Sequence, residues 1–201
     1  MDEIHLHFQR HDPTIFAWMT KLGPLEPIKK DSPANYFFRL CREIVCQQLS
    51  DKAGRAILDR FEQLFTGKTV AAETILALSH EQLRAAGMSN AKASYLHNLA
   101  AHVSQKKVEL SQFDTMSDDE IVAALTQVKG IGPWTAEMFL MFTLGRQSVF
   151  SFGDLGLKKG LMKVYGFATD PTKAQITELI AKWSPYKSYA SRILWASLDN
   201  R

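Results

Sequence analysis

The stretch Leu125-Thr-Gln-Val-Lys-Gly-Ile-Gly-Pro-Trp-Thr-Ala136 lies between two segments that have helical hydrophobic spacing. Gly130 and Gly132 flank one apolar residue there, and Pro133 stands where the next helix begins. Two glycines so close together let the backbone turn tightly and approach a ligand without obstruction by side chains. The free N–H groups of such a turn and of the helix start suit a phosphate oxygen. The stretch therefore predicts a phosphate-binding hairpin, with an ordinary glycine-rich turn between helices as the alternative.

Helix signals recur along the whole chain, and no segment has the alternation of a run of strands. Ser50 and Ser89 are N-cap residue types, and Ser79 with Gln82 forms a capping-box pattern that Gly87 ends. These signals predict helices over residues 13–21, 51–65, 79–86, 89–103, 133–144, 154–164, 172–183 and 188–198, with further starts at residues 33 and 117. The predicted fold class is all-α.

The composition indicates a globular protein. The 201 residues are 46% hydrophobic, enough for one good core or two small ones that share an interface. No apolar run approaches the roughly 18 to 20 residues needed to cross a bilayer, and the first residues are too polar for a signal peptide. We therefore expect a cytoplasmic protein without a membrane partner. Cys41 and Cys46 lie five residues apart in one apparent helix, which predicts small buried residues rather than a disulfide or a metal site.

Charge is distributed unevenly, although the net charge is only +3. Residues 1–128 hold 14 Lys and Arg against 16 Asp and Glu, whereas residues 129–201 hold 10 against 5. The basic residues of the last third include Lys158, Lys159, Lys163, Lys182, Lys187 and Arg192. This excess fits a nucleic-acid surface, but a solvated surface explains such clusters equally well.

Residues 128–139, VKGIGPWTAEMF, resemble the helix-hairpin-helix motif of the DNA glycosylase superfamily named for this hairpin, a Gly/Pro-rich loop and a catalytic Asp. Three further motifs follow the family's order, at residues 44–50, 149–159 and 185–195. The resemblance implies two helical subdomains without an extra N-terminal β domain, and an active site in the cleft between them. The predicted division joins residues 1–40 with 165–201 and leaves 41–164 as the central domain.

Asp154 matches the family's catalytic Asp, and the same position also suits a simple helix N-cap. In the family this carboxylate either stabilises the oxocarbenium-like sugar as the base leaves or orients a water molecule, and the sequence does not separate these roles. Bifunctional members carry a nucleophilic Lys two residues after the second hairpin glycine, where this chain has Trp134. The resemblance therefore implies a monofunctional, hydrolytic enzyme. A cysteine cluster for iron and sulfur is absent, and no cofactor is required.

The pattern is most similar to the alkylation-repair branch of 3-methyladenine DNA glycosylase II. Trp134 resembles the branch's pocket tryptophan, and Tyr186 matches a second pocket aromatic. Met138 and Leu155 stand where the branch has tyrosines, and we hypothesise that the Glu137 carboxylate reaches the flipped base. Aromatic faces attract a positively charged alkylated purine. The alternative is that Trp134, Met138 and Tyr186 are ordinary core residues.

The resemblance also assigns contacts with DNA. A target base must leave the duplex, and Gln48 aligns with the residue that fills the gap, while Asn90 matches a loop wedge. Both could instead be capping or surface amides. The remaining expected DNA contacts are Lys129, Gly130, Ile131, Gly132, Thr135 and Lys158.

The family hairpin often binds Na⁺ or K⁺ through backbone carbonyls, here those of Thr126, Val128 and Ile131, with a DNA phosphate completing the shell. The implied partner is double-stranded DNA containing alkylated bases, bound by a monomer. Two alternatives stay open, a non-catalytic hairpin module that docks DNA and a glycosylase for oxidised or mismatched bases. The preferred lesion and any protein partner are not defined by the sequence.

Overall fold

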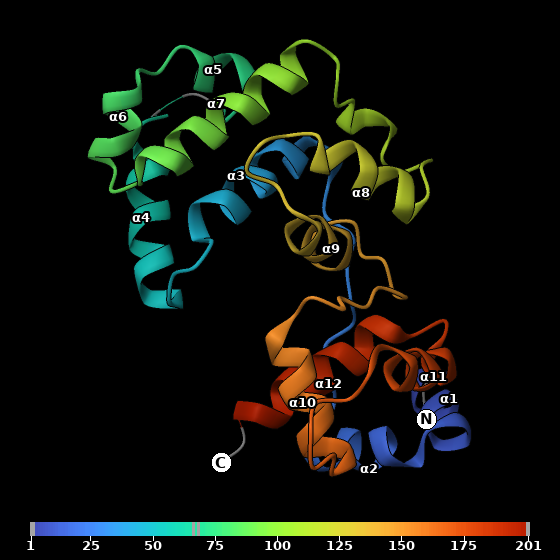
Figure 1. The fold of residues 1–201 in the computed structure, drawn as a ribbon. Coiled ribbons are helices and arrows are strands. Elements are labelled where there is room, and N and C mark those ends of the chain that lie inside the picture. The colour runs from blue at the N-terminus through green and yellow to red at the C-terminus, as the bar shows by residue number, and fades with distance from the viewer. Residues whose placement is uncertain (1–2, 66, 68, 200–201) are drawn as a thin grey trace. The chain divides into compact units, whose positions relative to one another are not determined.

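The computed structural model describes residues 3–65, 67 and 69–199, and all regular structure within them is helical (Figure 1). The α-helices are α1 (Glu3–His11), α2 (Pro13–Leu22), α3 (Tyr36–Cys46), α4 (Asp51–Gln63), α5 (Ala72–Leu76), α6 (His80–Ala85), α7 (Asn90–Ser104), α8 (Asp118–Thr126), α9 (Pro133–Phe142), α10 (Leu155–Tyr165), α11 (Lys173–Trp183) and α12 (Lys187–Asp199). Two short 3-10 helices, η1 (Pro33–Asn35) and η2 (Leu110–Gln112), complete the set. The all-α prediction is confirmed. No helix in the described ranges combines the length and apolar character needed to span a membrane.

The chain divides into two compact units, each with its own interior. The terminal unit joins Met1–Lys30 to Leu140–Arg201, and the central unit is Asp31–Phe139. These boundaries differ from the predicted ones, because residues 31–40 belong to the central unit and residues 140–164 to the terminal unit. The reason is packing. Helix α3 packs against α4 and α7, whereas α10 packs against α12 so closely that a Cβ at Gly160 would lie 2.8 Å from the Leu194 Cβ.

The buried carboxylate of Asp12 links three helices of the terminal unit through hydrogen bonds. Asp12 is the N-cap of α2 and only 4% exposed, and its Oδ1 accepts from the Ile15 N–H at 3.1 Å. Its Oδ2 accepts from the Tyr165 hydroxyl at 2.6 Å and from the Trp183 indole N–H at 2.8 Å. Burial and the hydrogen bond to Asp12 raise the pKa of Tyr165. Three donors thus satisfy one buried charge and tie α2 to α10 and α11.

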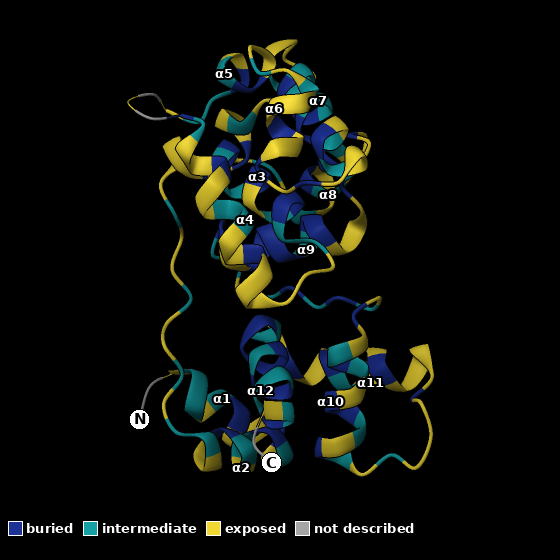
Figure 2. Cartoon of the chain, turned by 90° about the vertical axis from the view of Figure 1, so that its left-hand side faces the viewer, coloured by how far each residue is buried: buried dark blue, intermediate teal, exposed yellow. Residues whose placement is uncertain are grey.

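The central unit has an aromatic interior. Phe139 of α9 makes edge contacts with the rings of Tyr36 and Phe113, with centroid distances of 5.8 and 6.0 Å. Figure 2 shows α9 as one of the most buried helices of this unit. Cys41 is buried and Cys46 half-buried, both are unbridged, and burial raises the pKa of both thiols. Cys41 is a small core residue, as the sequence predicts, whereas Cys46 is only partly buried.

Candidate functional site

The predicted hairpin joins the end of α8 to the start of α9. Its two glycines differ in backbone conformation and in the space around them. Gly130 has a φ of 111°, and a Cβ there would lie 2.2 Å from Cγ of Tyr95. Gly132 would meet nothing within 4 Å. The first glycine is therefore required by the turn and by its contact with α7. The second leaves open backbone at the start of α9, where a phosphate could approach.

The hairpin forms one wall of a groove of about 440 Å³ in the central unit. The groove is lined by Gln47, Gln48, Ser89, Ala91, Lys92, Tyr95, Gly130, Ile131 and Gly132. The structure thus brings Gln48 to the same surface as the hairpin, although about 80 residues separate them. Gln48 is exposed and has a φ of 56°, a left-handed conformation that non-glycine residues rarely adopt.

Asn90 begins α7 next to this groove. Its Oδ1 accepts from Nη1 of Arg84 at 2.7 Å and lies 3.2 Å from Nε2 of His80. The amide is thus engaged at the surface of the free protein, and its role as a wedge stays a prediction.

The residues after the hairpin point in different directions along α9. Trp134 is 43% exposed, Glu137 is half-buried and Met138 is only 4% exposed. Thr135 is also buried, and its Oγ1 accepts from Nε2 of Gln47 at 3.2 Å. The exposed Trp134 can therefore contact a ligand that binds the central unit. The buried Thr135 instead supports the hairpin through its hydrogen bond with Gln47. Lys129 is exposed beside the glycines.

Asp154 lies in the terminal unit as the N-cap of α10 and is 7% exposed. Its Oδ1 accepts from the Leu157 N–H at 2.7 Å and from the Trp195 indole N–H at 3.1 Å. A Cβ at Gly156 would lie 3.0 Å from the same indole, so the glycine leaves room for it. Two donors and the N-terminus of α10 therefore hold this carboxylate in one orientation.

Trp195 is a side chain of this candidate site that sequence reasoning did not identify. The tryptophan stands in the last quoted motif, but a contact between α12 and the start of α10 leaves no local signal in the sequence. Its ring lies 5.9 Å from the half-exposed ring of Phe142, centroid to centroid, and Leu155 is 69% exposed. The terminal unit thus presents apolar and aromatic side chains next to a held carboxylate. Lys158, one turn into α10, is half-buried.

Tyr186 lies elsewhere in the terminal unit. Its ring makes edge contacts with His7 at 5.2 Å and Tyr189 at 6.2 Å. Its role as a substrate contact stays a prediction.

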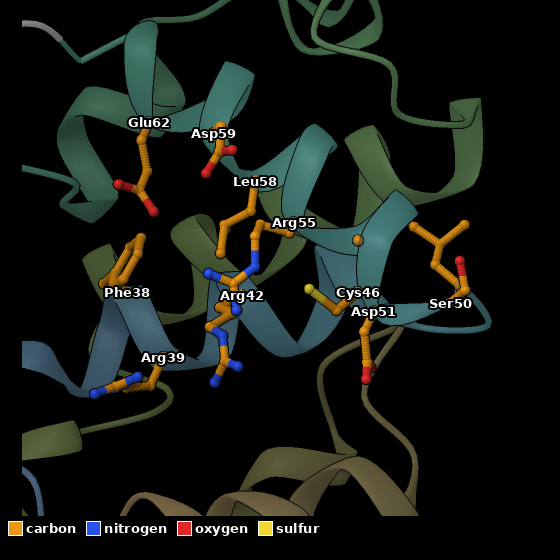
Figure 3. Close-up of a pocket in the computed structure, with 12 residues that line it drawn as sticks. Phe38, Arg39, Arg42, Cys46, Ser50, Asp51, Arg55, Leu58, Asp59 and Glu62 are labelled. Atoms are coloured by element: carbon orange, nitrogen blue, oxygen red, sulfur yellow. The ribbon is translucent and has the colours of Figure 1, made fainter.

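A second groove, of about 600 Å³, runs between α3 and α4 and contains none of the predicted site residues (Figure 3). Its charged residues are Arg39, Arg42, Arg55, Asp51, Asp59 and Glu62. With three arginines and three acids, the lining has a formal net charge of zero.

Metal-ligating side chains do not gather in the part of the chain that the structure describes, where no group of three or more His, Cys, Asp or Glu could hold an ion. The predicted cation ligands are backbone carbonyls. Thr126 ends α8, and the Val128 carbonyl accepts from the Ile131 N–H at 2.9 Å. Of the three, only the Thr126 carbonyl lies in the last turn of a helix, where intrahelical donors are missing, and the cation site stays a prediction.

Comparison with known proteins agrees with this geometry. A family model described as HhH-GPD superfamily base excision DNA repair protein matches residues 41–185. DNA-3-methyladenine glycosylase 1 of Schizosaccharomyces pombe is 32% identical over 197 residues, which cover 97% of this chain and 86% of that protein. The chain spans only 56% of the length of a Bacillus subtilis relative, 32% identical over 162 residues, whose name assigns it provisionally as a DNA-3-methyladenine glycosylase.

A solved structure is similar over nearly the whole chain. The 3-methyladenine DNA glycosylase of Schizosaccharomyces pombe in complex with abasic DNA aligns with a TM-score of 0.87 and 27% identity, covering 98% of this chain and 97% of that one. The likeness therefore extends beyond the 145 residues of the family match and covers nearly all of both units.

Proposed function

Because the chain belongs to the HhH-GPD superfamily of base excision DNA repair proteins, we propose that it is a glycosylase that removes alkylated bases of the 3-methyladenine type from duplex DNA. The observation that carries this proposal is the Asp154 carboxylate, held at the start of α10 by the Leu157 N–H and the Trp195 indole. A buried charge so firmly oriented is preorganised to stabilise positive charge that develops on a substrate.

The proposed reaction breaks the bond between the sugar C1′ and the base nitrogen, whose electron pair leaves with the base. Positive charge then spreads over C1′ and the ring oxygen, next to the Asp154 carboxylate. Water adds its oxygen to C1′ and loses a proton. Asp154 serves this step by stabilising the cation or by orienting the water, and both roles require a charged carboxylate.

Each unit supplies a different part of the proposed function. The central unit contributes the open hairpin backbone for a phosphate and the exposed side chains of Gln48 and Trp134. The terminal unit contributes Asp154 with the aromatic surface of Phe142 and Trp195. Aromatic faces favour a cationic purine by about 0.5 to 2 kcal/mol, which suits a base that already carries a positive charge.

We propose further that the enzyme is monofunctional. Trp134 stands at the position of the lyase lysine, so no amine is available there for a Schiff base. Lys129 lies before the glycines, where it suits a phosphate. The monomeric state and a Na⁺ or K⁺ ion held by the carbonyls of residues 126, 128 and 131 are further proposals. Such an ion would link the hairpin to a DNA phosphate and would take no part in bond cleavage.

A panel of lesions tests this function. The protein should release 3-methyladenine from duplex DNA and leave an intact abasic site, because it has no lyase amine at residue 134. Release is measured by chromatography of free bases from DNA containing 3-methyladenine, 7-methylguanine, ethenoadenine, hypoxanthine or 8-oxoguanine, and strand nicking by denaturing gels. Binding without any release would support the docking-module alternative, and preferential release of 8-oxoguanine would support the oxidised-base alternative.

Trp134→Ala tests the proposed pocket. Loss of the aromatic face should lower the single-turnover release of 3-methyladenine by about 2- to 30-fold, the factor that corresponds to 0.5 to 2 kcal/mol. Leu76→Ala removes another exposed apolar side chain of the central unit and should leave the rate unchanged. An unchanged rate for Trp134→Ala would count against a role in the pocket.

A further inference from the structure

One face of α7 holds the turn after α3. The Lys92 ammonium donates to the carbonyl of Val45 at 2.9 Å and to that of Gln47 at 2.6 Å. These carbonyls belong to the C-terminal end of α3, where intrahelical donors are missing and a positive charge is favourable. Burial lowers the pKa of Lys92, in keeping with an ammonium partly withdrawn from water. The side chain is thus committed to the protein's own backbone.

The same turn is attached to the hairpin. Nε2 of Gln47 donates to the Gly130 carbonyl at 3.0 Å and to Oγ1 of Thr135 at 3.2 Å. Lys92 therefore holds the backbone of Gln47, while the side chain of Gln47 holds the hairpin. We call Lys92 and Gln47 together the latch.

Helix α7 supports the hairpin at two further positions on the same face. The Tyr95 ring fills the space beside Gly130, and Nδ2 of Asn98 donates to the Lys129 carbonyl at 3.3 Å. Lys92, Tyr95 and Asn98 follow at intervals of three residues, which places them along one side of the helix. Two segments that are distant in the sequence are thereby held by one rigid element.

The residue next to the latch is Gln48, with its left-handed backbone. A residue in this conformation persists only where its surroundings hold it. The Gln47 carbonyl belongs to the peptide bond that leads into Gln48, so Lys92 restrains this conformation directly.

We propose that the latch sets the position of Gln48 relative to the hairpin before DNA is bound, which makes Lys92 a positioning residue for extrusion of the damaged base. This inference rests on the proposed function, since only a base-flipping enzyme needs a residue to fill the gap. Lys92 acts through the Gln48 turn and need not touch DNA.

The test compares Lys92→Met and Lys92→Arg with the wild type. Without DNA, amide hydrogen exchange should become about tenfold faster at residues 48–50 and 130–132 in Lys92→Met, because two charge-assisted hydrogen bonds are lost. Extrusion, followed by 2-aminopurine fluorescence beside a 3-methyladenine analogue, should slow by about tenfold, while affinity for undamaged duplex should change by less than about threefold. Lys92→Arg should recover part of both losses.

The controls separate a latch from general destabilisation. Lys107→Met removes an exposed lysine beyond the end of α7 and should change none of these measurements. Gln47→Leu breaks the other half of the latch, and its effect on extrusion should not add to that of Lys92→Met in the double variant. Thermal melting identifies any variant that fails to fold. If Lys92→Met does not fold, the same measurements are made on Lys92→Arg and Gln47→Leu.

Unchanged exchange at residues 48–50, or unchanged extrusion, in folded Lys92→Met would overturn the latch. A large loss of affinity for undamaged duplex without faster exchange at residues 130–132 would also overturn it, because Lys92 would then act on DNA directly and not through the hairpin. Failure of the wild type to release any alkylated base would contradict the proposed function instead, since exchange and fluorescence report on the latch without base release.

Discussion

Asp154→Asn is expected to lower the rate of 3-methyladenine release by about 100- to 1000-fold, the loss typical for removal of one preorganised electrostatic group. The substitution keeps the shape of the side chain but removes the negative charge that would face the cationic sugar. The measurement is single-turnover release of base, with affinity for DNA containing an abasic-site analogue measured in parallel. Affinity for this DNA should be retained, because the hairpin that binds the backbone is unchanged.

Asparagine also separates catalysis from helix capping. Asn is as good an N-cap as Asp, and its side-chain oxygen can still accept from the Leu157 N–H and the Trp195 indole. The melting temperature of Asp154→Asn should therefore stay near that of the wild type. Asp154→Ala removes the cap as well and should cost about 1 kcal/mol of stability.

Asp119→Asn provides a matched control, since Asp119 is an exposed acid in the first turn of α8. It should leave the rate of release unchanged. If Asp154→Asn kept wild-type activity, Asp154 would serve only as the N-cap of α10. The proposed reaction would then need another carboxylate.

Local signals predicted most of the helices, because caps and hydrophobic spacing act within one or two turns. The Ser79 capping box is present as predicted, with the Ser79 N–H donating to Oε1 of Gln82 at 2.8 Å and the Gln82 N–H to Oγ of Ser79 at 3.2 Å. Helix α1 was not predicted, since its nine residues are mostly polar and only Phe8 is buried. Helix α5 was missed because five residues are too few for a periodic pattern.

The site was predictable only where a motif carried it. The resemblance identified Gln48 and the hairpin glycines, and the structure brings them to one groove. It did not reveal that Trp195 donates to Asp154, because that bond depends on how α12 packs against α10. The hydrophobic periodicity of α9 likewise does not predict that Thr135 is buried while Trp134 is exposed, because this helix is apolar on most sides.

Gly130→Ala is expected to damage both stability and DNA binding. A methyl group at this position would lie 2.2 Å from Cγ and 2.5 Å from Cβ of Tyr95, and the φ of 111° is strained for any residue with a Cβ. Strain of about 1 to 3 kcal/mol, together with displacement of Tyr95, should lower the melting temperature by about 5 to 10 °C. The displaced hairpin should also weaken binding to duplex DNA by about tenfold or more.

Gly132→Ala serves as the contrasting variant, because a Cβ there would meet nothing within 4 Å. Its melting temperature should match the wild type, whereas its affinity for duplex DNA should fall, since the methyl group would occupy the space through which a phosphate reaches the backbone. Melting by circular dichroism and titration of fluorescent duplex at several salt concentrations give both quantities. If Gly132→Ala bound DNA as well as the wild type, the open backbone of the hairpin would not be the phosphate contact, and the DNA affinity would have to come from side chains such as Lys129.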